Sequence, residues 1–171
     1  MTSKHFENKM YNIATLSKTI FICVLMIIST IMSLKVTSYN CQSVNTNIGI
    51  IQSLCLASDV ILLQETLLNE NNHAILGNIN ANFDYAYTPA TRKPGVFVGR
   101  SSGGLAVLWR KSENIKFSPV YFTERIIGIY IIYNYYTYLI LNVYFICDYG
   151  DTESLIEYKS TIANCYNIIE N

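Results

Sequence analysis

The stretch Val60-Ile-Leu-Leu-Gln-Glu65-Thr66 constrains the fold of this chain more than any other. A short apolar run of this kind predicts a buried strand. The carboxylate of Glu65 lies where that strand emerges, and it is costly to bury there without a cation or a hydrogen-bond partner. Because α/β folds place their ligands at strand ends, Glu65 is the first candidate for a metal ligand. Taken alone, the residue is better interpreted as a Glu that begins a loop.

The residues upstream of this stretch complete a strand–helix–strand pattern. Residues 34–39 alternate apolar and polar side chains, which predicts a strand that ends near Asn40. Residues 47–57 carry apolar side chains at helical spacing, with Thr46 or Asn47 as the N-cap. The two strands of such a βαβ unit are parallel, so we expect Asn40 and Glu65 at the same edge of one sheet.

The rest of the chain adds further strands and one long helix. Strands are expected at residues 83–87, 105–109, 115–121, 126–133 and 137–144. A loop with a short helix is expected at 67–82, where His73 is interpreted as a surface residue, and a long exposed loop at 88–102. The final helix begins at Asp151 or Thr152 and carries a single apolar stripe, made of Leu155, Tyr158, Ile162, Tyr166 and Ile169.

Composition and cysteine spacing narrow the class of protein. The chain has 171 residues, of which 51% are hydrophobic and 14% charged, which fits one domain with a core and excludes a disordered tail. Its net charge of zero does not indicate any class of binding partner. The five cysteines form no C-x-x-C pair and the sequence has only two histidines, so no zinc site is visible. An odd number of scattered cysteines favours free buried thiols and a reducing compartment, with chance pairing left open.

Residues 1–33 are predicted to be a leader that is separate from a domain at residues 34–171. Lysines precede the apolar run at residues 20–32, as in a signal peptide, but the run is short for a spanning helix of about 20 residues. Three interpretations stay open: a signal or membrane anchor, a buried helix, and a non-native extension. We favour a membrane-directed segment, because a helix that is apolar on all faces has no evident place in a soluble core. Localisation is left open between a membrane or secreted location and an intracellular one.

Several polar residues at strand ends occur in an order that resembles a known superfamily. Asn40, Gln64-Glu65-Thr66, Gly103-Gly104 before an apolar strand, and Asn142-Val143-Tyr144 follow one another within residues 34–171. This ordered set resembles the endonuclease/exonuclease/phosphatase superfamily, and most closely the endonuclease domains of non-LTR retrotransposons and the apurinic endonucleases. The resemblance implies a DNase I-like, four-layer α/β sandwich, here incomplete, with one mixed sheet and flanking helices.

The resemblance also implies roles for three residues. Glu65 would hold a catalytic Mg²⁺ or Mn²⁺, Asn40 would orient the scissile phosphate or a partner carboxylate, and Tyr144 would hydrogen-bond the phosphate. A hard divalent cation takes oxygen ligands, usually with one or two carboxylates, and phosphodiester hydrolysis needs charge neutralised on the phosphate oxygens. The plainer interpretations are that Asn40 caps a loop and that Tyr144, one of fourteen tyrosines, packs in a strand.

DNA is the partner that the resemblance implies, and a basic stretch is compatible with it. Seven of the twelve basic residues lie between Arg92 and Arg125. A solvated surface loop is the commoner explanation of such a stretch. Three of these residues fall where a related nuclease would touch backbone phosphate, namely Arg92, Lys93 and Arg100.

The resemblance stops in the middle of the family's pattern. The family's later motifs, G-D-x-N, a distal Asp and S-D-H, supply the general base, further metal contacts and a histidine on the phosphate. This sequence contains none of them, and Ile146 stands where the family usually has a Pro. We therefore expect the N-terminal half of the domain, truncated and inactive. Two alternatives are a non-catalytic remnant or binding fragment, and a membrane-tethered lipid or phosphoinositide phosphatase, which only residues 20–32 suggest.

The sequence also leads us to expect that the chain is unstable on its own. In the fold that the resemblance implies, the missing half builds much of a second sheet. Strands such as 105–109, 126–133 and 139–144 would then keep one apolar sheet face in water, while the helices at residues 47–57 and 155–169 cover the other face with their apolar sides. We expect a chain of this kind to aggregate or to need a partner.

Overall fold

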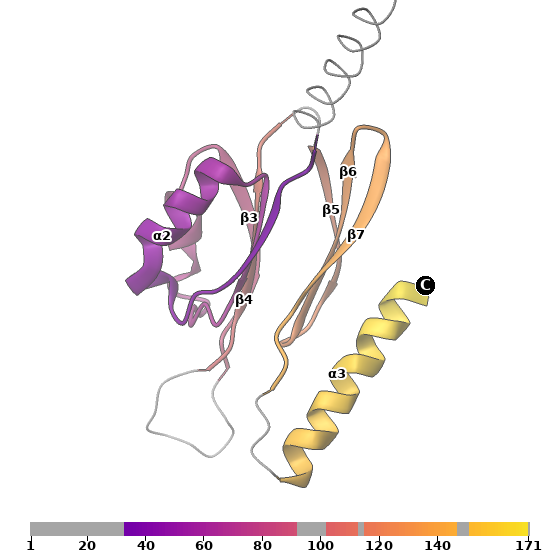
Figure 1. Ribbon diagram of the computed structural model, residues 1–171. Coiled ribbons are helices and arrows are strands. Elements are labelled where there is room, and N and C mark those ends of the chain that lie inside the picture. The colour runs from indigo at the N-terminus through magenta and orange to yellow at the C-terminus, as the bar shows by residue number, and fades with distance from the viewer. Residues whose placement is uncertain (1–32, 92–101, 113–114, 147–150, 171) are drawn as a thin grey trace, which may run out of the picture. The chain divides into compact units, whose positions relative to one another are not determined.

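A computed structural model describes residues 33–91, 102–112, 115–146 and 151–170 (Figure 1). The chain divides into two units, Met1–Ser33 and Leu34–Asn171, and all the elements described below belong to the second. The apolar run at residues 20–32 lies outside the described residues, so its role stays a prediction. Among the described residues, no helix is both long and apolar enough to cross a membrane.

A four-stranded mixed sheet forms the first half of the second unit. Its strands are β1 (Val36–Asn40), β2 (Val60–Gln64), β3 (Phe83–Thr88) and β4 (Leu105–Arg110), in the order β1-β2-β4-β3. The helix α2 (Val44–Ala57) connects β1 to β2, which are parallel, whereas β4 is antiparallel to both of its neighbours. The predicted βαβ unit is therefore present, and the short helix η1 (His73–Asn78) lies in the predicted loop.

A second, antiparallel sheet follows in the chain. Its strands β5 (Ile115–Phe122), β6 (Ile126–Tyr133) and β7 (Tyr136–Val143) pair in the order β5-β6-β7. The β6–β7 hairpin turns at Asn134 and Tyr135, whose φ angles of 50° and 70° are those of the mirror-image turns that match strand twist. The final helix α3 (Thr152–Glu170) comes after this sheet.

Two apolar clusters explain why the first four residues of β2 are apolar. On one face of the mixed sheet, Ile61 and Leu63 pack with residues of α2 such as Ile51. On the other face, Val60 and Leu62 pack with Ile127, Ile129 and Ile131 of the second sheet. Because both faces of β2 are covered, each of its five residues is buried, as the continuous apolar run predicts.

The predicted α/β sandwich with a mixed sheet is confirmed, and two details of the prediction need correction. The prediction that one apolar sheet face meets water was wrong, because β5, β6 and β7 form a sheet of their own that covers β2 and β4. The predicted orientation of the last helix, with its apolar stripe against the sheet, was also wrong. Its buried residues are Ser154 and Thr161, whereas Leu155 and Tyr166 of the predicted apolar stripe are exposed.

Candidate active site

The three residues that the sequence singled out meet at one carboxylate oxygen. Asn40 Nδ2 donates a hydrogen bond to Glu65 Oε1 over 2.9 Å. The Tyr144 hydroxyl donates to the same oxygen, also over 2.9 Å. Asn40 is exposed, and Glu65 and Tyr144 are half-buried, so the cluster is open to solvent on one side. Residues from β1, from the end of β2 and from the end of β7 therefore form one polar cluster.

The parallel pairing of β1 and β2 places Asn40 beside Glu65. Asn40 pairs in register with Gln64, so the amide lies next to the first residue beyond β2. The backbone N–H of Gln42 donates to Asn40 Oδ1 over 3.2 Å. This contact turns the amide so that its NH₂ group points to the Glu65 carboxylate.

The backbone at Glu65 adopts an unusual conformation that the neighbouring strand holds in place. Glu65 and Leu67 have φ angles of 52° and 56°, in the left-handed region that L side chains rarely adopt. Thr66 N–H donates to the Gly104 carbonyl over 3.1 Å, and Leu67 N–H donates to the Gly103 carbonyl over 3.2 Å. Left-handed conformations cost roughly 1–2 kcal/mol per residue, and these two hydrogen bonds offset part of that cost.

The second glycine of the Gly-Gly pair is required by close packing. Gly104 has a φ of 81°, and a Cβ there would lie 2.5 Å from Thr66 Oγ1 and 3.0 Å from the Ala90 nitrogen. Only glycine fits such a position. The motif thus lets β4 approach the Gln64-Glu65-Thr66 turn closely enough to hold it.

A buried pair of amides, which the sequence did not single out as functional, links the two sheets beneath the site. Asn142 is 1% exposed and accepts a hydrogen bond from Gln64 Nε2 over 2.5 Å. Its own NH₂ group donates to the Leu63 and Ala106 carbonyls, each over 3.0 Å. Gln64 precedes Glu65, and Asn142 lies two residues before Tyr144. Gln64 and Asn142 stand close to Glu65 and Tyr144 in the two sequence motifs, and these polar neighbours were the sequence signal that could have predicted the pair.

Arg125 is a second residue that sequence reasoning missed. Its carbonyl accepts a hydrogen bond from Tyr144 N–H over 2.9 Å. Its guanidinium carbon lies 5.3 Å from the centre of the Tyr144 ring, within range of a cation–π contact. The same guanidinium forms an ion pair with Glu157 of α3 at 2.7 Å. Arg125 therefore fixes the end of β7 and joins it to α3.

Comparison with known proteins identifies the family. The sequence pattern of the Endonuclease/Exonuclease/phosphatase family matches residues 37–151, more than half of the chain. The chain belongs to this family. No curated protein sequence matches it significantly.

Solved structures of DNA-processing enzymes share the family fold. The 3′ phosphatase NExo from Neisseria, bound to product DNA hairpin, is 17% identical with a TM-score of 0.54 and covers 77% of this chain and 49% of its own. The AP endonuclease LMAP from Leishmania major is 16% identical with a TM-score of 0.54, over 73% of this chain and 44% of its own. The APE2 catalytic domain from Xenopus laevis is 16% identical with a TM-score of 0.51, over 75% and 52%. At this identity the likeness shows the fold, and the chain spans about half the length of these structures.

The family generally depends on a divalent metal, and the donors around Glu65 suit a hard cation in part. Mg²⁺ is usually bound through one or two carboxylates, with waters and substrate phosphate completing its shell. Both hydrogen bonds to Glu65 end on Oε1, and neither of them uses Oε2, so a cation held by this carboxylate would bind at Oε2. In the part of the chain that the structure describes, no three His, Cys, Asp or Glu residues form a group that could hold a metal ion. Glu65 would therefore be the one carboxylate that this cluster supplies.

Other residues named from the sequence lie elsewhere. Arg92, Lys93 and Arg100 lie outside the described residues, so their contact with phosphate stays a prediction. His73 stacks on the Tyr87 ring at a centroid distance of 4.2 Å, and its Nδ1 lies 3.2 Å from the Tyr85 hydroxyl.

Proposed function

We propose that this chain carries part of the active site of a metal-dependent phosphodiesterase of the retroelement endonuclease type, with DNA as its substrate class. In this proposal Glu65 holds Mg²⁺ or Mn²⁺, and Asn40 and Tyr144 orient the scissile phosphate. The observation that carries the proposal is the convergence of the Asn40 amide and the Tyr144 hydroxyl on Glu65 Oε1. Residues 79 positions apart are brought together there, as a single reaction centre requires.

The chemistry of these side chains fits in-line attack of water on phosphorus. A bound divalent cation supplies charge neutralisation at the phosphate oxygens. Asn40 and Tyr144 offer neutral hydrogen-bond donors, which can move from the carboxylate to a phosphate oxygen without competing for the cation. Before substrate binds, their bonds to Oε1 keep the Glu65 carboxylate in one orientation, which lowers the reorganisation needed on binding.

We also infer that the 171-residue polypeptide alone turns over poorly. The sequence holds no G-D-x-N or S-D-H motif, which the resemblance associates with the general base and the histidine. Losing one member of a cooperating catalytic set already lowers rates by orders of magnitude. This inference leaves a role in binding DNA without cleavage as the alternative.

Metal titration tests the role of Glu65. We expect calorimetry with Mn²⁺ to detect weak binding to the native chain and none to Glu65→Gln, which keeps the shape and removes the charge. Glu153→Gln is the matched control, because Glu153 is an exposed carboxylate in the first turn of α3. Equal affinity for the native chain and Glu65→Gln would remove Glu65 from the site.

A plasmid assay tests turnover separately. With Mg²⁺ or Mn²⁺, we expect no nicking of supercoiled plasmid above that of a Glu65→Ala control. Strong nicking that Glu65→Ala abolishes would contradict the inference of poor turnover, and it would show that the residues in this chain suffice.

A further inference from the structure

Arg125 lies in the short connection between β5 and β6, where the hydrogen bonds of that connection hold its backbone. The Thr123 hydroxyl accepts from the backbone N–H groups of Arg125 over 3.3 Å and of Ile126 over 3.0 Å. Thr123 N–H in turn donates to the Ile126 carbonyl over 2.8 Å. The Arg125 side chain therefore leaves the connection from a defined position.

Glu157 of α3 fixes the plane of the Arg125 guanidinium. Nε donates to Glu157 Oε1 over 2.7 Å, and Nη2 forms an ion pair with the same oxygen, also at 2.7 Å. The two side chains are only 26% and 39% exposed. Because a guanidinium is a rigid, planar group, two contacts to one oxygen leave it little freedom to rotate. The helix therefore decides where this cation lies.

The guanidinium held in this way lies over the ring of Tyr144. Its central carbon is 5.3 Å from the ring centre, a distance at which a cation attracts the face of an aromatic ring. The Arg125 carbonyl also accepts the Tyr144 N–H over 2.9 Å, so one residue contacts both the backbone and the ring of Tyr144. Since the phenol oxygen lies in the ring plane, the orientation of the ring sets where the hydroxyl points, and here it points to Glu65 Oε1.

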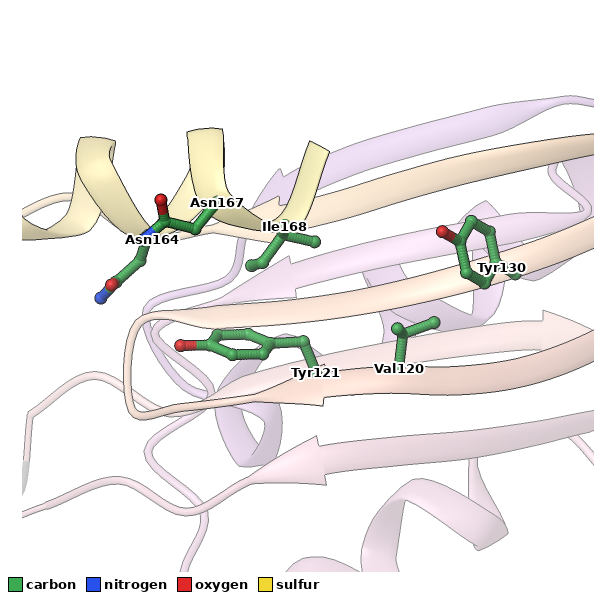
Figure 2. A pocket seen from close by; sticks show the side chains of 6 residues that line it. All are labelled: Val120, Tyr121, Tyr130, Asn164, Asn167 and Ile168. Atoms are coloured by element: carbon green, nitrogen blue, oxygen red, sulfur yellow. The ribbon is translucent and has the colours of Figure 1, made fainter. Parts of the chain in front are cut away.

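The second half of α3 packs loosely on the sheet. A cavity of about 470 Å³ lies there, between the helix and strands β5 and β6 (Figure 2). Its lining residues, all labelled in Figure 2, are Val120, Tyr121, Tyr130, Asn164, Asn167 and Ile168. Glu157, in contrast, lies between Ser154 and Thr161, the two buried residues of the helix. The ion pair is therefore in the closely packed part of α3, and a shift of the helix acts directly on Arg125.

We propose that Arg125 is a positioning residue of the candidate site, and that Glu157 of α3 acts on the Tyr144 hydroxyl through it. The inference rests on the proposed function, because it concerns how a donor to Glu65 and to a phosphate oxygen is aimed. When Glu157 releases the guanidinium, the Tyr144 ring loses the contact that orients it, and the hydroxyl leaves Glu65 Oε1. The helix thereby controls one donor of the site through a single side chain.

A purely structural ion pair predicts a different result. Such a pair would hold α3 on the sheet, and its removal would lower the stability of the chain without changing the groups around Glu65. The Asn40 NH₂ group separates the two cases. It contacts Glu65 Oε1 from the mixed sheet, whereas the ion pair joins the β5–β6 connection to α3.

Nuclear magnetic resonance of the ¹⁵N-labelled full chain, without metal or DNA, measures this effect. The Asn40 NH₂ signal is identified by its loss in Asn40→Asp. In Glu157→Gln, which keeps the shape and removes the charge, we expect this signal to shift toward its position in Tyr144→Phe. Glu153→Gln is the matched control, because Glu153 is an exposed carboxylate one helical turn earlier in α3, and it should leave the signal unchanged.

Double variants test the route of the effect. Glu157→Gln should add no further shift in a Tyr144→Phe or an Arg125→Met background, because the group through which it acts is already absent. Arg125→Lys keeps the cation but not the planar fork, so it should shift the signal less than Arg125→Met. An unchanged Asn40 signal in Glu157→Gln, or an equal shift with and without the Tyr144 hydroxyl, overturns the proposal.

Calorimetry with Mn²⁺ connects the position of Tyr144 to the proposed function. Arg125→Met and Tyr144→Phe should each weaken Mn²⁺ binding by about two- to tenfold, the effect of one lost hydrogen bond, and the double variant should bind as Tyr144→Phe does. Equal affinity of the native chain and Arg125→Met would overturn the role of Arg125 in the site. If Mn²⁺ binds none of these chains, the proposed function fails, and the Asn40 signal still decides whether Arg125 positions Tyr144.

Discussion

Replacing Asn142 with alanine should destabilise the fold by about 3 kcal/mol. The substitution removes the hydrogen bonds to Gln64 Nε2 and to the Leu63 and Ala106 carbonyls. Each buried hydrogen bond contributes about 1 kcal/mol net, and a buried donor left without its partner costs a further 1–3 kcal/mol. Because Gln64 Nε2 keeps a contact with Ser38 at 3.2 Å, it is not left without a partner, so only the three lost hydrogen bonds count and they sum to about 3 kcal/mol. The loss is a large share of the 5–15 kcal/mol by which a domain is stable.

Urea unfolding followed by tryptophan fluorescence measures this loss. The chain has a single tryptophan, Trp109 in β4, whose ring stacks on Phe117 of β5 at a centroid distance of 3.6 Å. The signal therefore reports the contact between the two sheets. With a slope of 1–3 kcal/mol per M for urea, the midpoint of Asn142→Ala should fall by about 1–3 M. Thr137→Ala, on an exposed residue of the same strand, is the control and should shift it by much less.

A double-mutant cycle separates the amide pair from simple loss of packing. If Gln64 and Asn142 act on each other, the cost of Gln64→Ala should be smaller in the Asn142→Ala background by about 1–2 kcal/mol. Strictly additive effects, or an Asn142→Ala midpoint equal to that of Thr137→Ala, would refute the view that this pair joins the sheets.

Two further predictions follow from the backbone and from a buried thiol. Gly103→Ala and Gly104→Ala both place alanine at positive φ, but only a Cβ at Gly104 meets Thr66 Oγ1 at 2.5 Å; at Gly103 the nearest atom is 4.0 Å away. Gly103→Ala should therefore cost about 1–2 kcal/mol and Gly104→Ala clearly more, and equal urea midpoints would contradict the clash. Burial raises the pKa of the Cys55 thiol, although the Arg110 charge opposes the shift. An unfolded thiol ionises near pH 8.5, so the stability that comes from keeping the Cys55 thiol protonated is complete below that pH and is lost as the pH rises through the raised pKa of the folded chain. Cys55→Ala should therefore lose less stability than the native chain between pH 7 and 10. An equal loss in the two chains would contradict this prediction.

The part of the site that could be predicted from the sequence depends on local pattern. The strand–helix–strand order fixes β1 and β2 as parallel neighbours, and this brings Asn40 to Glu65 without further information. Tyr144 is different, because it reaches Glu65 from the other sheet. Periodicity predicts which face of a strand is apolar, but not which sheet covers that face. The ordered motifs alone associated Tyr144 with the site.

The errors in the prediction have the same physical origin. The apolar strands β4 and β6 were expected to leave one face in water, because nothing in their composition says that they lie in different sheets and cover each other. The stripe on α3 was expected to face the core, because an apolar stripe usually does. Instead the Arg125–Glu157 ion pair joins the polar side of the helix to the second sheet, and Ser154 and Thr161 are its buried residues. A single ion pair to a helix leaves no periodic signal in the sequence.

The conformation of Glu65 shows why local propensity fails at this site while the motif succeeds. Neither Glu65 nor Leu67 is a residue type that favours positive φ, so no turn rule predicts the bend after β2. The bend exists because Gly103 and Gly104 of the neighbouring segment accept hydrogen bonds from Leu67 and Thr66 across a gap that any side chain on Gly104 would fill. Strain of this kind persists only where the surroundings over-determine it. The direction of the Glu65 carboxylate is thus set by a glycine pair almost forty residues away, and a substitution at Gly104 should disturb the site without touching any of the three residues that form it.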